Sequence, residues 1–133
     1  MASGTAKLAI DDALFTLLAH VGLGKAREKL PAMLQKIPVT VIKIATHPHG
    51  IEIRGLGFIK PVFQPSISPD GLIDLRLQVN TLDLSALGDL LRNLINDQVD
   101  ELRKLVEDQG LHFHLREVQT RQNELVITAT VTD

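Results

Sequence analysis

The stretch DLSALGDLLRNLINDQVDELRKLVEDQ, from Asp83 to Gln109, has the residue spacing of a long amphipathic helix. At about 100° per residue, its apolar side chains cover about half of the helix circumference, a wider face than the seam of a two-stranded coiled coil. This face holds Leu84, Leu87, Leu90, Leu91, Leu94, Ile95, Val99, Leu102, Leu105 and Val106. Because so broad a face must be buried, the pattern predicts a sheet packed against the helix.

Gln98 projects into the middle of this apolar face. A buried amide needs hydrogen-bond partners. Three interpretations are open: Gln98 bonds to a strand end, it is exposed where the helix outruns the sheet, or it fixes the polar part of a ligand in an apolar cavity.

Segments with strand spacing lie on both sides of the predicted helix. Residues 38–80 predict four strands, and residues 111–132 predict a C-terminal hairpin. The most regular strand, Leu72 to Asn80, alternates between an apolar and a polar face. Its apolar side chains are Ile73, Leu75, Leu77 and Val79.

The N-terminal part of the chain has helical spacing as well. Apolar residues from Ile10 to Val21 recur every three or four positions, and residues 7–37 as a whole predict helices. Residues 1–6 predict a disordered tail. Together the patterns predict one α+β domain over residues 1–133, in which an antiparallel, strongly curved sheet packs against the long helix, with helices at the N-terminus.

Composition narrows the functions that we expect. The net charge of −2 provides no basic surface for nucleic acid, and the chain lacks Trp and Tyr for stacking on bases. Without cysteine it can form neither a disulfide framework nor a thiolate metal site. We also expect no transmembrane segment, because no apolar run is long enough. The sequence as written favours a cytoplasmic location, and export or anchoring stays open if the N-terminus is trimmed.

Two glycine-containing stretches depart from the nucleotide-binding motifs that they resemble. In VGLGKA, a phosphate loop would need glycine in place of Ala19 and serine or threonine in place of Ala26. In GLGFIK, from Gly55 to Lys60, the last glycine of a dinucleotide fingerprint is missing. We therefore predict that the first stretch is a turn that ends a helix and that the second is a bulge or bend in the sheet. Neither indicates a cofactor.

Two His-x-His pairs, His47/His49 and His112/His114, are the candidates for metal chemistry. On a strand, this spacing places both imidazoles on one face, where they could share a zinc or copper ion. No carboxylate or cysteine completes either set nearby in the sequence. Surface histidines, pH-sensitive or inert, are the simpler interpretation. We therefore predict no metal site and no catalytic residue, which means a protein that is not an enzyme.

The order of elements is similar to that of the tubular lipid-binding (TULIP) superfamily. The resemblance covers about Lys25 to Asp133 and includes a proline-bearing strand, the turn Ser68-Pro69-Asp70-Gly71 and the long apolar-faced helix. Modules of that superfamily wrap a highly bent sheet around a long helix and hold lipids between the two. The resemblance implies lipid binding, and because it lies in element order it assigns no ligand-binding residue.

Two functions are left open. The first is non-enzymatic binding of a lipid or other hydrophobic ligand in an aliphatic cavity between helix and sheet, which calls for a continuous cavity of roughly 300 Å³ or more. The predicted lining residues are Leu87, Leu91, Leu94, Ile95, Gln98, Leu102, Ile73, Leu75, Leu77 and Ile127. The alternative is a structural or assembly module that buries its surplus apolar face against a second copy, as a homodimer, or against another protein.

Overall fold

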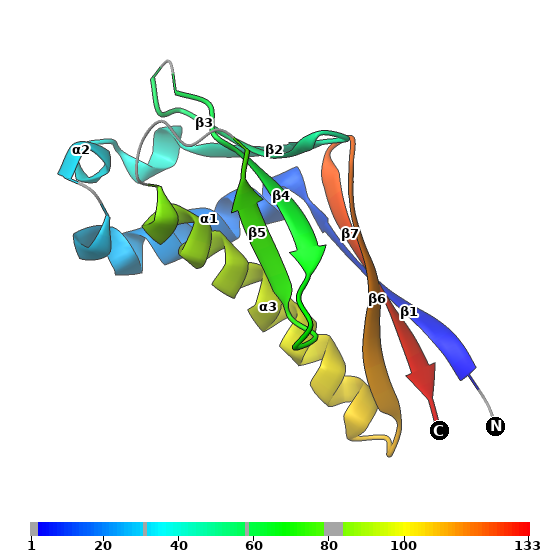
Figure 1. Ribbon diagram of the computed structural model, residues 1–133. Helices are drawn as coiled ribbons and strands as arrows, with labels where there is room; N and C mark the ends of the chain where they lie inside the picture. Colours follow the sequence, from blue (N-terminus) through cyan, green and yellow to red (C-terminus); the bar gives the residue numbers. More distant parts are fainter. Residues whose placement is uncertain (1–2, 31, 58, 79–83) are drawn as a thin grey trace.

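The computed structural model describes residues 3–30, 32–57, 59–78 and 84–133. The helices are α1 (Asp12–Ala26), α2 (Ala32–Gln35) and α3 (Ser85–Glu107), with 3-10 turns at Arg27–Lys29 and Val39–Val41. The strands are β1 (Ser3–Asp11), β2 (Lys43–His47), β3 (Gly50–Arg54), β4 (Val62–Ile67), β5 (Ile73–Leu77), β6 (His112–Arg121) and β7 (Glu124–Thr132). Figure 1 shows their arrangement.

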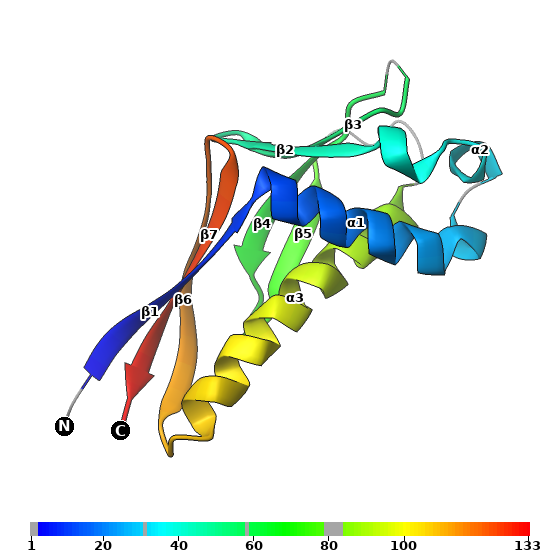
Figure 2. The same cartoon turned by 180° about the vertical axis from the view of Figure 1, so that it is seen from behind.

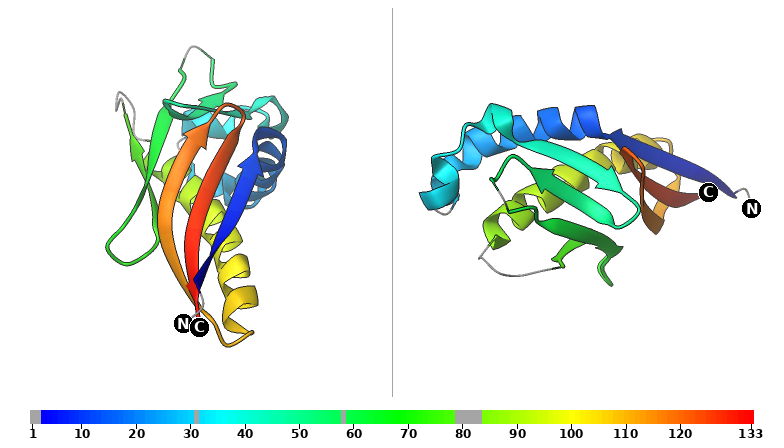
Figure 3. Two further views of the ribbon diagram at one scale, coloured as in Figure 1. Left: turned by 90° about the vertical axis from the view of Figure 1, so that its right-hand side faces the viewer. Right: turned by 90° about the horizontal axis from the view of Figure 1, so that it is seen from above.

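The strands form two antiparallel sheets, with the orders β1-β7-β6 and β2-β3-β4-β5. Seen from behind in Figure 2, α1 and α3 lie in front of the four-stranded sheet. The three-stranded sheet faces the viewer in the left panel of Figure 3, and both chain termini lie at the same end of it. An α+β fold with antiparallel strands and a long helix packed against them is therefore confirmed.

The buried face of α3 follows one row of residues at every fourth position: Leu87, Leu91, Ile95 and Val99, each 0–2% exposed. Each step of four residues moves about 40° around the helix, so the buried row winds across the broad apolar face. Other members of that face stay at its edge, and Leu105 is 68% exposed. The two sheets and α1 thus cover most of the predicted face, and Leu105 is the one exposed member among its described residues.

The N-terminal prediction was imprecise, because α1 and α2 do lie within residues 7–37 but a strand precedes them. Ser3–Asp11 forms strand β1 and not a tail followed by the start of a helix. Ile10 pairs with Leu125 of β7 and is 1% exposed, whereas Asp11 is exposed, which is strand alternation. The alternation of Ala6, Leu8 and Ile10 with exposed residues has the period of a strand, whereas the helical spacing applies after Ile10, and pairing with β7 stabilises the strand. The helix begins at Asp12, capped by the Asp11 carboxylate, which accepts a hydrogen bond from the Leu14 N–H at 2.8 Å.

The predicted helix-ending turn was also wrong, because Gly22 and Gly24 lie inside α1. A β-carbon at Gly22 would lie 3.1 Å from Cδ1 of Leu90, so this glycine permits close approach of α1 and α3. The second glycine stretch does bend the chain: Gly55 and Gly57 have φ of 97° and 77°. Both conformations favour glycine.

The long helix and the C-terminal hairpin are confirmed, with β6 and β7 joined at a turn in which Asn123 has φ of 68°. The predicted helix start at Asp83 and the predicted strand end at Val79 and Asn80 lie outside the described residues. Within the described residues, no helix has the length and apolar content needed to cross a membrane.

Candidate functional site

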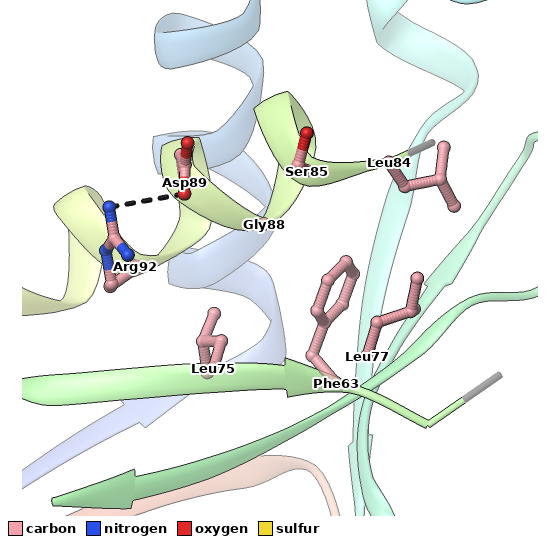
Figure 4. Close-up of a pocket in the computed structure, with 8 residues that line it drawn as sticks. All are labelled: Phe63, Leu75, Leu77, Leu84, Ser85, Gly88, Asp89 and Arg92. Atoms are coloured by element: carbon pink, nitrogen blue, oxygen red, sulfur yellow. Dashed lines mark ion pairs between the residues drawn. The ribbon is translucent and has the colours of Figure 1, made fainter. Parts of the chain in front are cut away.

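A pocket of about 220 Å³ lies between the first turns of α3 and the strands β4 and β5 (Figure 4). It is lined by Phe63, Leu75, Leu77, Leu84, Ser85, Gly88, Asp89 and Arg92. In Figure 4, the side chains of Phe63, Leu75 and Leu77 point from the strands toward the helix. The pocket therefore has an apolar floor, and the helix forms its other wall.

The apolar floor of the pocket results from the pairing of β4 with β5, in which side chains alternate between the two faces of the sheet. Phe63 of β4 lies opposite Leu77 of β5, and Pro65 lies opposite Leu75. Directly opposite residues share one face of an antiparallel pair, so these side chains gather on the side that faces α3. Arg76, between the two leucines, is exposed on the other face.

Gly88 sets the distance between the helix and the floor. A β-carbon at this position would lie 3.0 Å from Cε1 of Phe63, so the missing side chain makes room for the phenyl ring. The ring is 2% exposed. Glycine inside a helix costs roughly 0.5–1 kcal/mol relative to alanine, and this contact is the physical reason for its presence here.

The rim of the pocket is charged. Nη2 of Arg92 lies 3.2 Å from Oδ1 of Asp89, and Nη1 lies 3.9 Å from Oδ1 of Asp74 on β5. All three side chains are substantially exposed to solvent. Ion pairs at such exposure contribute little to stability, so their main effect is to balance charge around the opening.

The predicted lining residues divide into three groups. Leu75 and Leu77 line the pocket. Five others are 0–2% exposed and belong to the hydrophobic core: Leu87, Leu91, Ile95, Ile73 and Ile127. The rest are half-buried: Leu94, Gln98 and Leu102. Gln98 has no side-chain hydrogen-bond partner among the described residues, and it is half-buried beside Val99 of the core row.

Sequence patterns did not predict Phe63, Leu84, Gly88 or the charged rim as pocket residues. Gly88, at the edge of the apolar face of the helix, was the one sign of the pocket in the sequence, because glycine is disfavoured inside helices. The aromatic partner of that glycine lies on a strand 25 positions earlier. No local spacing connects the two.

Two grooves beside α3 are more open to solvent than this pocket. One, of about 470 Å³, is lined mainly by polar side chains that include Asp74, Asn96 and Asp97. The other, of about 500 Å³, lies between the turn at Asp70 and the start of β6. Because both grooves are wider open to solvent, they would bury less of a hydrophobic ligand than the pocket beside Phe63.

In the first histidine pair, the His47 ring is held by a carboxylate. Nε2 of His47 lies 2.9 Å from Oε2 of Glu52, whose other oxygen lies 3.2 Å from Nε of Arg54. The hydrogen bond from His47 is the main cause that lowers the pKa of Glu52, and burial partly opposes it. Within the described ranges, no group of three or more His, Asp or Glu side chains is arranged to hold a metal ion.

Comparisons of the chain with protein-family models, with curated proteins and with solved structures gave no match. The chemistry of the pocket is therefore the guide to function.

Proposed function

We propose that this chain is a non-enzymatic binding protein for a lipid or other hydrophobic molecule. The pocket beside Phe63 takes the end of an apolar chain or a single ring of that molecule. The observation that carries the proposal is the apolar floor of Phe63, Leu75 and Leu77 between the long helix and the sheet. The resemblance of the element order to the tubular lipid-binding superfamily supports the same class of ligand.

The size of the pocket limits what it takes. Its volume of about 220 Å³ is smaller than the cavity of roughly 300 Å³ or more that we expected for a whole ligand, so the pocket encloses only part of a hydrophobic molecule. It exceeds the roughly 150 Å³ of an apolar cavity that holds benzene. A longer ligand therefore places one end in the pocket and the remainder along the charged rim.

The small volume of the pocket also limits the binding free energy that it can supply. Burial of about four methylene groups contributes about 3 kcal/mol, which by itself is weaker than millimolar binding. A tightly bound ligand must therefore also contact residues at the opening, where Asp89 and Arg92 lie. Because these two charges pair with each other, the pocket selects by shape and apolar surface more than by net charge.

The proposal is tested by titrating the protein with benzene and with n-octanol while following the methyl NMR signals of Leu75 and Leu77. We expect saturable shifts in these signals. Leu77→Trp should fill the pocket and abolish the shifts of the Leu75 signals, whereas Leu105→Trp, at an exposed position on α3, should keep the shifts of both leucines. Unchanged titration of a folded Leu77→Trp variant would show that these molecules bind elsewhere.

Native mass spectrometry of protein purified from cells identifies a natural ligand. Under the proposal, a bound mass accompanies the wild-type chain and the Leu105→Trp variant and is lost from Leu77→Trp. A bound mass that persists in all three proteins would place the ligand outside this pocket.

A further inference from the structure

The outer face of α1 carries apolar side chains that the described part of the chain leaves uncovered. Leu14, Leu17 and Val21 are 42%, 63% and 59% exposed. They recur at positions i, i+3 and i+7, so they lie along one stripe of the helix. The opposite side of α1 is apolar as well and is buried, through Phe15, Ala19 and Leu23. A helix that is apolar on both sides is typical of one that is covered on both sides.

The stripe has the geometry of a helix-pairing seam. Spacing of three and then four residues is the a, d, a pattern of one coiled-coil heptad. The stripe is narrow, and half-buried Leu18 lies at its edge. Beside it, Leu90 of α3 contacts α1 at Gly22 and is itself half-buried, so apolar surface continues from the stripe onto α3.

The charges at the two ends of α1 are opposite. Asp11 caps the N-terminus, Lys25 lies in the last turn, and both are exposed. Asp11, Leu18 and Lys25 are seven residues apart, so they follow the same edge of the stripe. A copy of α1 turned end for end therefore brings its Lys25 opposite Asp11, and its Val21 within one residue, roughly 1.5 Å along the axis, of Leu14. The surface is complementary to itself, which is what a twofold dimer requires.

We propose that this chain forms a homodimer in which two α1 helices pair antiparallel about a twofold axis near Leu18. Antiparallel pairing also sets the partial positive charge of each helix N-terminus beside the partial negative charge of the other C-terminus. A membrane surface is a less suitable partner for this stripe. Helices that lie on membranes carry several basic residues along their polar face, whereas α1 holds Lys25 alone. This dimer is independent of the pocket beside Phe63.

The size of the stripe predicts a reversible dimer. Stable interfaces bury roughly 1,200–2,000 Å² in total, and three leucine or valine side chains on each copy cannot supply that area alone. Sedimentation velocity or light scattering should therefore show a dimer fraction that rises with protein concentration. Val21→Glu should weaken association at least about tenfold, because it places a charge in the seam of both copies. Val41→Glu is the matched control, since Val41 is 47% exposed on the 3-10 turn outside the stripe.

Cysteine cross-linking tests the orientation, and the chain has no cysteine of its own. A mixture of Leu14→Cys and Val21→Cys proteins should form the mixed disulfide faster than either protein cross-links with itself. Lys25→Glu should weaken the dimer, and adding Asp11→Asn, which keeps a capping side chain, should restore part of the loss. A chain that stays monomeric at all concentrations overturns the proposal. Faster cross-linking of each variant with itself overturns the antiparallel arrangement.

Discussion

The side-chain amide of Asn96 on α3 forms two hydrogen bonds with the backbone of Ile73 on β5. Its Oδ1 accepts from the Ile73 N–H, and its Nδ2 donates to the Ile73 carbonyl, both at 2.9 Å. β5 is the last strand of the four-stranded sheet, so these backbone groups have no neighbouring strand to pair with. Asn96 takes the place of such a strand and fixes α3 to the sheet edge beside the pocket.

Asn96→Ala should lower the free energy of unfolding by about 1–3 kcal/mol, because it leaves two buried backbone groups of Ile73 without a partner. Urea unfolding measures the loss, and amide hydrogen exchange at Ile73 should become faster. Asn93→Ala, an exposed asparagine one turn earlier on the same helix, should change stability by less than about 0.5 kcal/mol. Equal effects of the two substitutions would contradict a specific role for Asn96 at this edge.

Gly88→Ala and Gly24→Ala form a matched pair with opposite expected signs. At Gly24 a β-carbon meets nothing within 4 Å, so alanine should stabilise the protein by about 0.5–1 kcal/mol. At Gly88 the same methyl group lies 3.0 Å from the Phe63 ring, and overpacking of about 1–3 kcal/mol should outweigh the gain in helix propensity. Thermal unfolding compares the two variants. Stabilisation by Gly88→Ala would show that the Phe63 ring moves aside at little cost in free energy.

Local periodicity predicted α3 well because its apolar residues are numerous and its length is unambiguous. Periodicity could not show which part of the apolar face is buried. That depends on where the strands and α1 lie against the helix. The row through Leu91 is in the core, while Leu105 is exposed. The same limit explains β1: its partner β7 lies at the other end of the chain, and no window around Ile10 contains that information.

The pocket was harder to predict than the fold. Leu75 and Leu77 were correctly placed on the face toward the helix because strand alternation fixes their side. Five other predicted lining residues pack in the core, because an apolar pattern marks burial and carries no record of whether the space beside it is filled. The Phe63–Gly88 contact that shapes the pocket joins distant segments and becomes visible in three dimensions alone.

Acid should destabilise the fold through Glu52. The hydrogen bond from His47 and the neighbouring Arg54 hold the pKa of this carboxyl below its ordinary value of 4.5. Because the folded-state pKa is the lower one, the stabilisation is complete above the ordinary value and is lost as pH falls through the folded-state pKa. Glu52→Gln should therefore flatten the decline of unfolding free energy with falling pH in this acid range. Glu101→Gln, an exposed change on α3, is the control and should preserve the wild-type slope.

Leu91→Glu should abolish cooperative folding, because Leu91 is 0% exposed in the core row of α3. The lost apolar contacts cost about 2–5 kcal/mol and the buried carboxylate adds to that, which together approach a typical total stability of roughly 5–15 kcal/mol. Leu105→Glu introduces the same side chain on the same helix at a position 68% exposed, and it should shift stability by less than about 0.5 kcal/mol. Circular dichroism during urea unfolding distinguishes the two. If Leu91→Glu unfolds like wild type, the row from Leu87 to Val99 does not face the core. The position of α3 as one wall of the pocket would then be wrong as well.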